Sequence, residues 1–219
     1  MEHTMQDQGS TAASASAERA ASGYPRAGSS IEDLARFAVE TAMQKGADYA
    51  DARIVRLARE TLTVHNGAVA DAEAPDEFGV GLRVLKNGAF GFAAAPTTYG
   101  ELGDVLPGLA RRALAIARDL APLRRRPIRL SGEASGRGEY VTPFVENPFM
   151  VPLEEKVDLL LRADRGMSGR REIVSRLASI SIQREEQWQA TSEGGATHQV
   201  LMRAGGRIEA LASAGGVVE

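Results

Sequence analysis

The hydrophobic positions beyond residue 29 change their spacing several times, and each spacing predicts a different element. The first run repeats with the 3.6-residue period of an amphipathic helix. Its apolar face consists of Ile31, Leu34, Phe37, Ala38 and Ala42. Ser30 and Asp33 form a capping-box pattern before this run, and Gly46 follows its last turn. The pattern therefore predicts a helix at about 31–45.

The next segment alternates with a period of two, which is typical of strands. Its apolar members are Ala50, Ala52, Ile54, Leu62 and Val64. Asn66-Gly67 follows and readily supplies the two positive-φ positions of a type I′ turn. A second such turn, Asn87-Gly88, lies between two more alternating runs, so we predict a hairpin there. The runs carry Val80, Leu82 and Val84 before the turn and Phe90 and Phe92 after it.

Two further helices follow from the return of the helical period. One starts near Thr98, where Glu101 completes a capping box, and ends near Pro122. Its buried stripe consists of Leu102, Val105, Leu106, Leu109, Ala113 and Ile116. Pro152 opens the other helix, whose apolar positions are Leu153, Val157, Leu160 and Leu161. Residues 122–151 are rich in Pro, Gly and Arg, so we predict an irregular connection between the two helices.

Beyond Gly169 the pattern again indicates strands. Even spacing relates Val174, Ala178, Ile180 and Ile182, and Trp188 then leads into a Thr-Ser-Glu-Gly-Gly turn at 191–195. Two more strands are predicted at about 200–203 and 208–212, joined across Gly205-Gly206. The order of elements predicts an α+β fold, with a mostly antiparallel sheet packed against about three helices.

Composition adds an N-terminal tail and excludes several classes of protein. The first 30 of the 219 residues contain no Leu, Ile, Val, Phe or Trp, so we expect residues 1–29 to be a disordered Ala/Ser/Gly-rich tail. Residues 30–219 should then form one domain with one core. The absence of cysteine excludes a disulfide scaffold, a zinc-thiolate site and a thiol nucleophile. No run of apolar residues is long enough to cross a membrane, so we expect a cytoplasmic protein without a membrane partner.

A search for catalytic patterns finds none. The histidines, His3, His65 and His198, lack the spacing of metal ligands and are interpreted as solvent-exposed. The segment 166–170 begins like a nucleophile elbow, but it ends a helix, so we interpret it as a turn. The glycine-rich segment 132–138 lacks flanking strand and helix signals and is interpreted as a flexible loop. We therefore assign no catalytic, cofactor-binding or metal-binding residue.

Arginines are concentrated between residues 111 and 137. The eight are Arg111, Arg112, Arg118, Arg124, Arg125, Arg126, Arg129 and Arg137. They face only Asp119 and Glu133 in this stretch, so the segment could contact nucleic acid or an acidic protein surface. A solvated helix end followed by a loop is the interpretation that we favour for this segment. Because no aromatic residue lies between Tyr99 and Tyr140 and the whole chain has a net charge of −3, we expect no nucleic-acid partner.

Four segments resemble the TldD/PmbA family. Residues 46–53 (Gly-Ala-Asp-Tyr-Ala-Asp-Ala-Arg) resemble its opening, and residues 79–93 resemble its most recognisable stretch. Residues 151–157 (Val-Pro-Leu-Glu-Glu-Lys-Val) resemble a segment of TldD-type members, and Thr-Ser-Glu-Gly at 191–194 resembles the family's Ser-x-Gly turn. The resemblance covers about residues 30–219 and identifies them with the family's N-terminal α+β domain.

The resemblance implies a cytoplasmic zinc metallopeptidase, historically called a modulator of DNA gyrase. In the family, a TldD-type subunit pairs with a PmbA/TldE-type subunit, and the dimer hydrolyses unfolded or extended peptides. The zinc ligands belong to an H-E-x-x-x-H helix and a later cysteine in the C-terminal half, and this sequence has neither. We therefore expect a fragment without the metallopeptidase half, inactive alone, with zinc belonging to the full-length protein.

Two functions remain open at this point. The chain could be the substrate-flanking and dimerisation part of such a peptidase, paired with a PmbA/TldE-type subunit or with a second copy. Alternatively, it could be a stand-alone, non-catalytic module that binds peptides or a partner.

Overall fold

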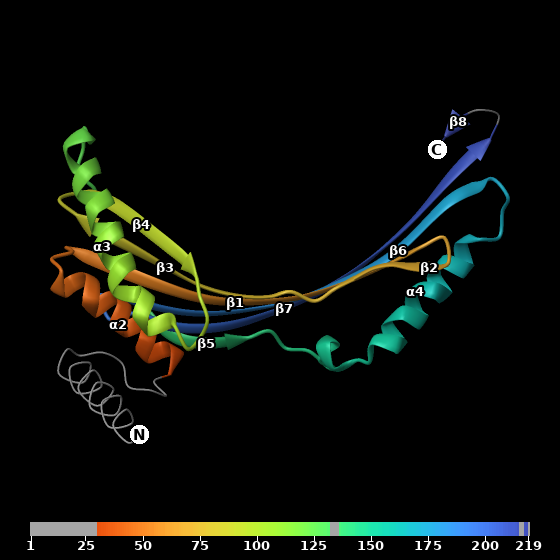
Figure 1. Cartoon of the computed structure of the whole chain (residues 1–219), viewed down its shortest axis with the longest axis horizontal. Helices are drawn as coiled ribbons and strands as arrows, with labels where there is room; N and C mark the ends of the chain where they lie inside the picture. The colour runs from red at the N-terminus through yellow and green to blue at the C-terminus, as the bar shows by residue number, and fades with distance from the viewer. Residues whose placement is uncertain (1–29, 132–135, 215–216, 219) are drawn as a thin grey trace, which may run out of the picture. The chain divides into compact units, whose positions relative to one another are not determined.

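The computed structural model describes residues 30–131, 136–214 and 217–218 of the chain (Figure 1). The tail predicted at 1–29 lies outside the described residues, as do positions 132–135 of the predicted glycine-rich loop. The described α-helices are α2 (Ile31–Gln44), α3 (Leu102–Leu120) and α4 (Leu153–Met167). The strands are β1 (Tyr49–His65), β2 (Ala68–Glu73), β3 (Asp76–Lys86), β4 (Ala89–Pro96), β5 (Arg137–Val141), β6 (Ile173–Thr191), β7 (Ala196–Ala214) and β8 (Val217–Val218). These elements confirm the α+β class.

The strands form one sheet in the order β4-β3-β1-β6-β7-β5, with β2 paired to β1 and β8 to β7. The pairs β1–β2, β3–β4 and β7–β8 are antiparallel. The Ser192 N–H donates to the Ala50 carbonyl and the Asn66 N–H to the Arg176 carbonyl, so β6 also runs antiparallel to β1. The mostly antiparallel sheet predicted from sequence is therefore confirmed.

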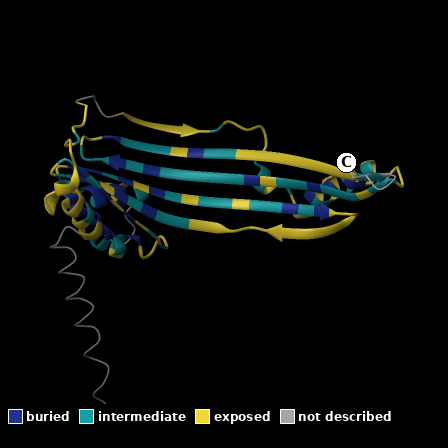
Figure 2. Ribbon diagram, turned by 90° about the horizontal axis from the view of Figure 1, so that it is seen from above, coloured by how far each residue is buried: buried dark blue, intermediate teal, exposed yellow. Residues whose placement is uncertain are grey.

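The edge strand β5 is the exception to this antiparallel order. The Ala196 N–H donates to the Gly136 carbonyl, and the Thr142 N–H donates to the Val200 carbonyl. Because residue numbers rise together along both strands, β5 runs parallel to β7. β5 lies inside the stretch 122–151 that we predicted to be irregular, so that part of the prediction is wrong. All five of its residues are exposed (Figure 2), and it therefore lacked the alternation that reveals half-buried strands.

The chain divides into two compact units, and the strands β1, β6 and β7 contribute residues to both. Unit 1 comprises Met1–Val55, Phe78–Gly138 and Gln187–His198. Unit 2 comprises Arg56–Glu77, Glu139–Glu186 and Gln199–Glu219. Each unit has its own cluster of buried apolar side chains, in place of the one core that we expected from the length.

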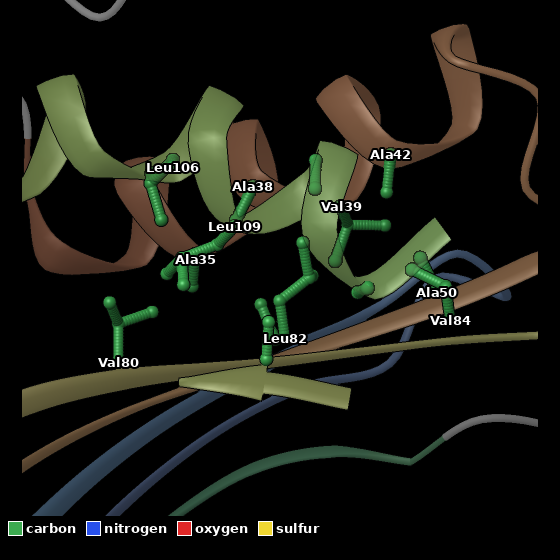
Figure 3. Packing of buried hydrophobic residues seen from close by; sticks show 14 of the residues in the cluster. Ala35, Ala38, Val39, Ala42, Ala50, Val80, Leu82, Val84, Leu106 and Leu109 are labelled. Carbon is green, nitrogen blue, oxygen red and sulfur yellow. The ribbon is translucent and has the colours of Figure 1, made fainter. Parts of the chain in front are cut away.

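In unit 1, the helices α2 and α3 pack on one face of β1, β3 and β4 (Figure 3). The predicted strand faces are confirmed, because Ala50, Ala52 and Ile54 are completely buried. Val80, Leu82 and Val84 meet helix residues such as Leu106 and Leu109. On β4 the core-facing positions are Ala89, Gly91 and Ala93, whereas Phe92 is 58% exposed.

Contact between α3 and β4 depends on a residue without a side chain. A Cβ atom at Gly91 would lie 2.0 Å from the Ala113 carbonyl oxygen and 2.6 Å from the Ala117 nitrogen. Both are backbone atoms of α3. Glycine is therefore required here by the closeness of the helix rather than by an unusual φ angle.

In unit 2, α4 packs on β1 and β6 around a smaller cluster. Its buried members are Leu62, Val64, Leu160 and Ala178. The buried positions of α4 are Lys156, Leu160 and Asp164, spaced four residues apart. The predicted apolar stripe of this helix is therefore only partly right, since Leu153 is 55% exposed. Two of the three residues on the buried face carry charges.

The local signals at helix ends and turns have mixed outcomes. The Ser30–Asp33 capping box is present, with the Ser30 hydroxyl accepting from the Asp33 N–H at 3.1 Å. Both Asn-Gly turns have positive φ at each central residue, as predicted. The start predicted for α3 is wrong by four residues. Thr98 and Glu101 do bond to each other, at 2.9 Å between side chains, but within a turn that precedes the helix.

The Gly205-Gly206 pair does not separate two strands. Residues Ala196–Ala214 form the single strand β7, and neither glycine has a positive φ. A glycine pair ends a strand only where the backbone turns, and here the sheet holds both residues extended. None of the helices in the described ranges combines the length and the apolar character that crossing a membrane requires.

Candidate functional site

A pocket of about 480 Å³ lies within unit 2, between β1, β2 and the beginning of α4. This volume falls in the usual range for binding sites of small molecules or side chains. Its apolar lining includes Leu62, Ala72, Phe149, Met150, Val151 and Leu153. Its charged lining residues are Glu60, Glu73 and Lys156. The pocket thus offers a mainly apolar surface with two carboxylates and one ammonium group.

The segment before α4 is shaped by a side-chain cap and two prolines. The Asn147 side chain accepts a hydrogen bond from the Phe149 N–H at 3.0 Å. Pro148 occupies the first turn of the short 3₁₀-helix Pro148–Met150, and Pro152 is the N-cap of α4. Because proline fixes φ, these residues restrict how Phe149 and its neighbours can line the pocket.

The charged part of the pocket is a buried ion pair. The Lys156 Nζ donates to both carboxylate oxygens of Glu60, at 2.8 and 2.9 Å. The side chains are 6% and 16% exposed, respectively. Each charge compensates the other, which is the condition under which a buried charge is tolerated. The pair joins α4 to β1 and gives the pocket a polar wall without a net charge.

A second ion pair on the same helix is also buried. The Arg176 Nε donates to Asp164 Oδ1 at 3.1 Å, and the Asp164 side chain is only 2% exposed. The Arg176 N–H in turn donates to the Asn66 side-chain oxygen at 2.9 Å. Gly67 of the same turn packs close to Asp164, since a Cβ there would lie 3.6 Å from Oδ2. These contacts hold the β1–β2 turn against α4, which is a structural role.

The histidines lie in separate places. His3 is outside the described residues. His65 is exposed, as predicted, and its Nε2 lies 3.0 Å from the Ser175 hydroxyl. His198 is partly buried instead, because its ring stacks on Trp188 with 5.1 Å between centroids and 9° between planes. The rings of Trp188 and His198 line a smaller pocket of about 190 Å³ in unit 1.

Unit 1 also carries a charged group on the sheet that the sequence patterns did not reveal. Arg83 donates to Asp51 Oδ2 at 2.8 Å, and its guanidinium lies 4.9 Å from the centre of the Phe90 ring. The hydrogen bond from Arg83 to Asp51 raises the pKa of the guanidinium further. Burial, followed by the charge of Asp51, raises the pKa of the Tyr49 hydroxyl. Burial of Tyr49 and the pairing of Arg83 with Asp51 therefore account for these pKa shifts.

Within the described ranges, no three His, Cys, Asp or Glu side chains lie close enough together to hold a metal ion. The residues present therefore do not fit a zinc site, and we derive no zinc-dependent step from them. The elbow-like segment 166–170 is the turn that ends α4, as predicted, with the Ser168 hydroxyl donating to the Arg165 carbonyl at 2.8 Å.

Residues 50–117 match the family model for PmbA/TldA metallopeptidase domain 1. Residues 50–117 therefore form a TldD/PmbA-family domain. The match runs from β1 to the last turns of α3 and includes the β3–β4 hairpin. Among curated proteins, none matches the sequence.

Solved structures extend the similarity of this TldD/PmbA-family domain over most of the chain. A candidate modulator of a DNA gyrase from Thermotoga maritima has a TM-score of 0.64 at 15% identity, covering 85% of this chain and 41% of that one. Its counterpart from Bacteroides thetaiotaomicron has a TM-score of 0.68 at 14% identity, covering 85% and 42%. TldE from Thermococcus kodakarensis has a TM-score of 0.56 at 19% identity, covering 86% and 40%. At these identities the similarity concerns the fold, and the chain spans about two-fifths of the length of each relative.

Proposed function

We propose that this domain is the non-catalytic, N-terminal part of a cytoplasmic TldD-like zinc metallopeptidase that hydrolyses extended peptides. In this proposal the domain helps to hold the peptide and pairs with a second subunit, while the zinc chemistry belongs to the C-terminal half of full-length family members. The observation that carries the proposal is the match of residues 50–117 to the metallopeptidase domain model.

The pocket of unit 2 supports a role in holding peptides. Its volume of about 480 Å³ is sufficient for one or two apolar side chains, and Phe149, Met150 and Leu153 offer matching surface. Met150 and Leu153 are 76% and 55% exposed, so a peptide could reach the pocket without a rearrangement of the core. The buried pair Lys156–Glu60 adds hydrogen-bonding groups that could meet a peptide amide.

Exposed apolar residues support pairing with a second subunit. From the last two residues of β5 to the first residue of α4, the exposed large apolar side chains are Tyr140, Val141, Phe144, Val145, Met150 and Leu153. Such a concentration within 14 residues exceeds the scattered exposure that is usual for a monomer surface. TldE is among the structural relatives, and a PmbA/TldE-type subunit is accordingly the partner that we propose first, with a second copy as the alternative.

Two leucines of α4 provide a matched test of peptide binding. Leu153 and Leu159 are 55% and 51% exposed, but only Leu153 lines the pocket. We expect a fluorescein-labelled extended peptide rich in Leu and Thr to bind the purified chain, and Leu153→Gln to weaken binding about fivefold. Leu159→Gln should change the affinity less than twofold, which is within the scatter for a surface substitution. Equal losses in both variants, or no binding by the unchanged chain, would contradict this role.

Assembly and catalysis are tested separately. Co-expression with a PmbA/TldE-type subunit should yield a heterodimer by light scattering, whereas a homodimer of the chain alone would support the alternative. The chain alone should cleave no peptide. Stoichiometric zinc together with chelator-sensitive peptidase activity in the purified chain would overturn the non-catalytic assignment.

The stand-alone module remains a second candidate because the pocket lies entirely within unit 2. It would bind the labelled peptide with the same affinity whether or not the second subunit is present. An affinity that rises on addition of that subunit would instead favour the assembled peptidase.

A further inference from the structure

The basic residues near the end of α3 lie on a surface that the proposed function does not use. In unit 1, the Arg118 guanidinium at the end of α3 donates to the Lys45 carbonyl after α2, at 3.3 Å. The segment 121–130 then passes the β3–β4 turn, where the Ile128 N–H donates to the Gly88 carbonyl at 2.8 Å. Helix ends, turn and segment thus meet at one end of unit 1, which we call the basic end. Its cations are Lys45, Lys86, Arg118, Arg124, Arg125, Arg126 and Arg129.

The segment 121–130 is held in place by close packing. Gly88 has φ of +73°, and a Cβ atom there would lie 2.4 Å from the Pro127 Cβ. Pro127 therefore rests directly on the turn, between Arg126 and Arg129 in sequence. This contact and the Ile128–Gly88 hydrogen bond hold the segment beside Arg126 and Arg129 against the turn, which lowers the entropic cost of binding a partner there.

The charge of the basic end is only slightly compensated. Seven cations face Asp48 and Asp119, and Asp48 is already engaged by the Lys86 ammonium at 2.9 Å. Arg124, Arg125, Arg126 and Arg129 are all exposed. Because the whole chain has a net charge of −3, this concentration is a local feature that complements an acidic partner.

Exposed leucines among the arginines favour a protein partner over nucleic acid. Leu120, Leu123 and Leu130 are 41%, 77% and 40% exposed. Nucleic-acid phosphates offer these side chains no apolar contact, and no aromatic residue between Tyr99 and Tyr140 could stack on bases. An acidic protein segment can bind both the arginines and the leucines. Its carboxylates accept bidentate hydrogen bonds from arginine, and its apolar side chains cover the leucines.

We propose that the basic end of unit 1 binds an acidic protein segment that carries leucine-like side chains. The residues that recognise it are the arginines at 124–126 and Leu123. This site is independent of the pocket in unit 2, so the two proposals can fail separately.

A synthetic peptide with the repeat Glu-Leu-Glu provides the probe. Its binding to the full chain is followed by fluorescence anisotropy at about 50 mM and about 300 mM salt, where screening should weaken it. We expect the charge reversal R124E/R125E/R126E to weaken binding at least about tenfold. The matched reversal R162E/R170E/R171E, of three exposed arginines in unit 2, should change it less than about twofold. Leu123→Ala should weaken binding about threefold, and circular dichroism should show that every variant is folded.

Comparison probes decide between classes of partner. The proposal requires weaker binding of a Glu-Ser-Glu repeat, of oligothymidylate and of vesicles containing anionic lipid than of the Glu-Leu-Glu peptide. Equal binding of the two peptides would overturn the role of the leucines. Tighter binding of oligothymidylate or vesicles would replace the acidic segment with nucleic acid or a membrane surface. Equal losses in the two triple variants, or no peptide binding by the unchanged chain, would overturn the site itself.

Discussion

The Lys156 ammonium on α4 donates to both carboxylate oxygens of Glu60 on β1, at 2.8 and 2.9 Å, from a side chain that is only 6% exposed. The two residues lie 96 positions apart in the chain. The pair therefore joins the helix to the sheet in unit 2 and forms part of the pocket proposed for peptides.

Replacing one member of this pair should destabilise the protein. Lys156→Met leaves the Glu60 carboxylate, 16% exposed, without its compensating charge, and we expect the free energy of unfolding to fall by about 3 kcal/mol. The double variant K156M/E60L removes both charges and should recover most of that loss. Urea unfolding measures all three proteins. An unchanged midpoint for K156M would show that the pair adds nothing to stability.

Substituting two strand glycines, Gly91 and Gly205, distinguishes a glycine required by close packing from one that only makes the unfolded chain more flexible. A Cβ at Gly91 would lie 2.0 Å from the Ala113 carbonyl oxygen, whereas a Cβ at Gly205 has no atom within 4 Å. Gly91→Ala should therefore cost about 3 kcal/mol, because the backbone of α3 must move. Gly205→Ala should be neutral or stabilise by up to about 1 kcal/mol, through the lower entropy of the unfolded chain. Similar unfolding temperatures for the two variants would contradict the close helix–strand contact.

Acid should remove one contribution to stability at the β3–β4 turn. The Lys86 ammonium, followed by the Asn87 N–H, lowers the pKa of Asp48 below its usual range near 3.8. A lowered folded-state pKa means that this contribution is present above pH 4 and is lost as pH falls through the folded value. Asp48→Asn should thus destabilise the protein at neutral pH, and the difference from the unchanged chain should shrink below pH 4.

Urea unfolding across this pH range measures the effect of Asp48→Asn. As the control, Lys86→Met is introduced into the unchanged chain and into Asp48→Asn. It should reduce the difference in unfolding free energy between them at neutral pH, because the Lys86 ammonium is the main cause of the lowered Asp48 pKa. A stability difference between Asp48→Asn and the unchanged chain that is constant from neutral to acid pH would contradict the stabilising role of the Asp48 carboxylate.

The single tryptophan reports on its stacking partner. His198 stacks on Trp188 with 5.1 Å between ring centroids and 9° between planes, so the imidazole covers one face of the indole. Removing this ring in His198→Ala should expose that face to water and shift the tryptophan emission maximum to longer wavelength. His65→Ala, which removes a histidine of unit 2, should leave the emission unchanged. Equal emission spectra for all three proteins would refute the stack in solution.

Short-range patterns predicted much of this domain. The capping box at Ser30, the two Asn-Gly turns and the core-facing positions of β1 and β3 depend on residues a few positions apart, and all are present. Of the four segments that resembled the TldD/PmbA family, the family match includes residues 79–93 and most of 46–53. The segments 151–157 and 191–194 lie outside the matched residues. Periodicity was informative here because each element has one covered face.

Other features depended on neighbours distant in the chain. β5 pairs with β7 while all five of its residues are exposed, so no alternation of apolar residues could mark it. The sheet holds Gly205-Gly206 extended, although the same dipeptide would suit a turn. The buried face of α4 carries Lys156 and Asp164, which a hydrophobic pattern assigns to solvent.

By itself, the sequence determined most of the segments that become helices and strands and which face of most of them is covered, because these properties follow from local sterics and the spacing of apolar groups. Only the tertiary structure decided what covers each face. Glu60 and Arg176 make the two charges on α4 compatible with burial, and the second cluster of buried side chains gives the chain two compact units. A buried charge is tolerated only beside its partner, and that partner comes from another part of the chain.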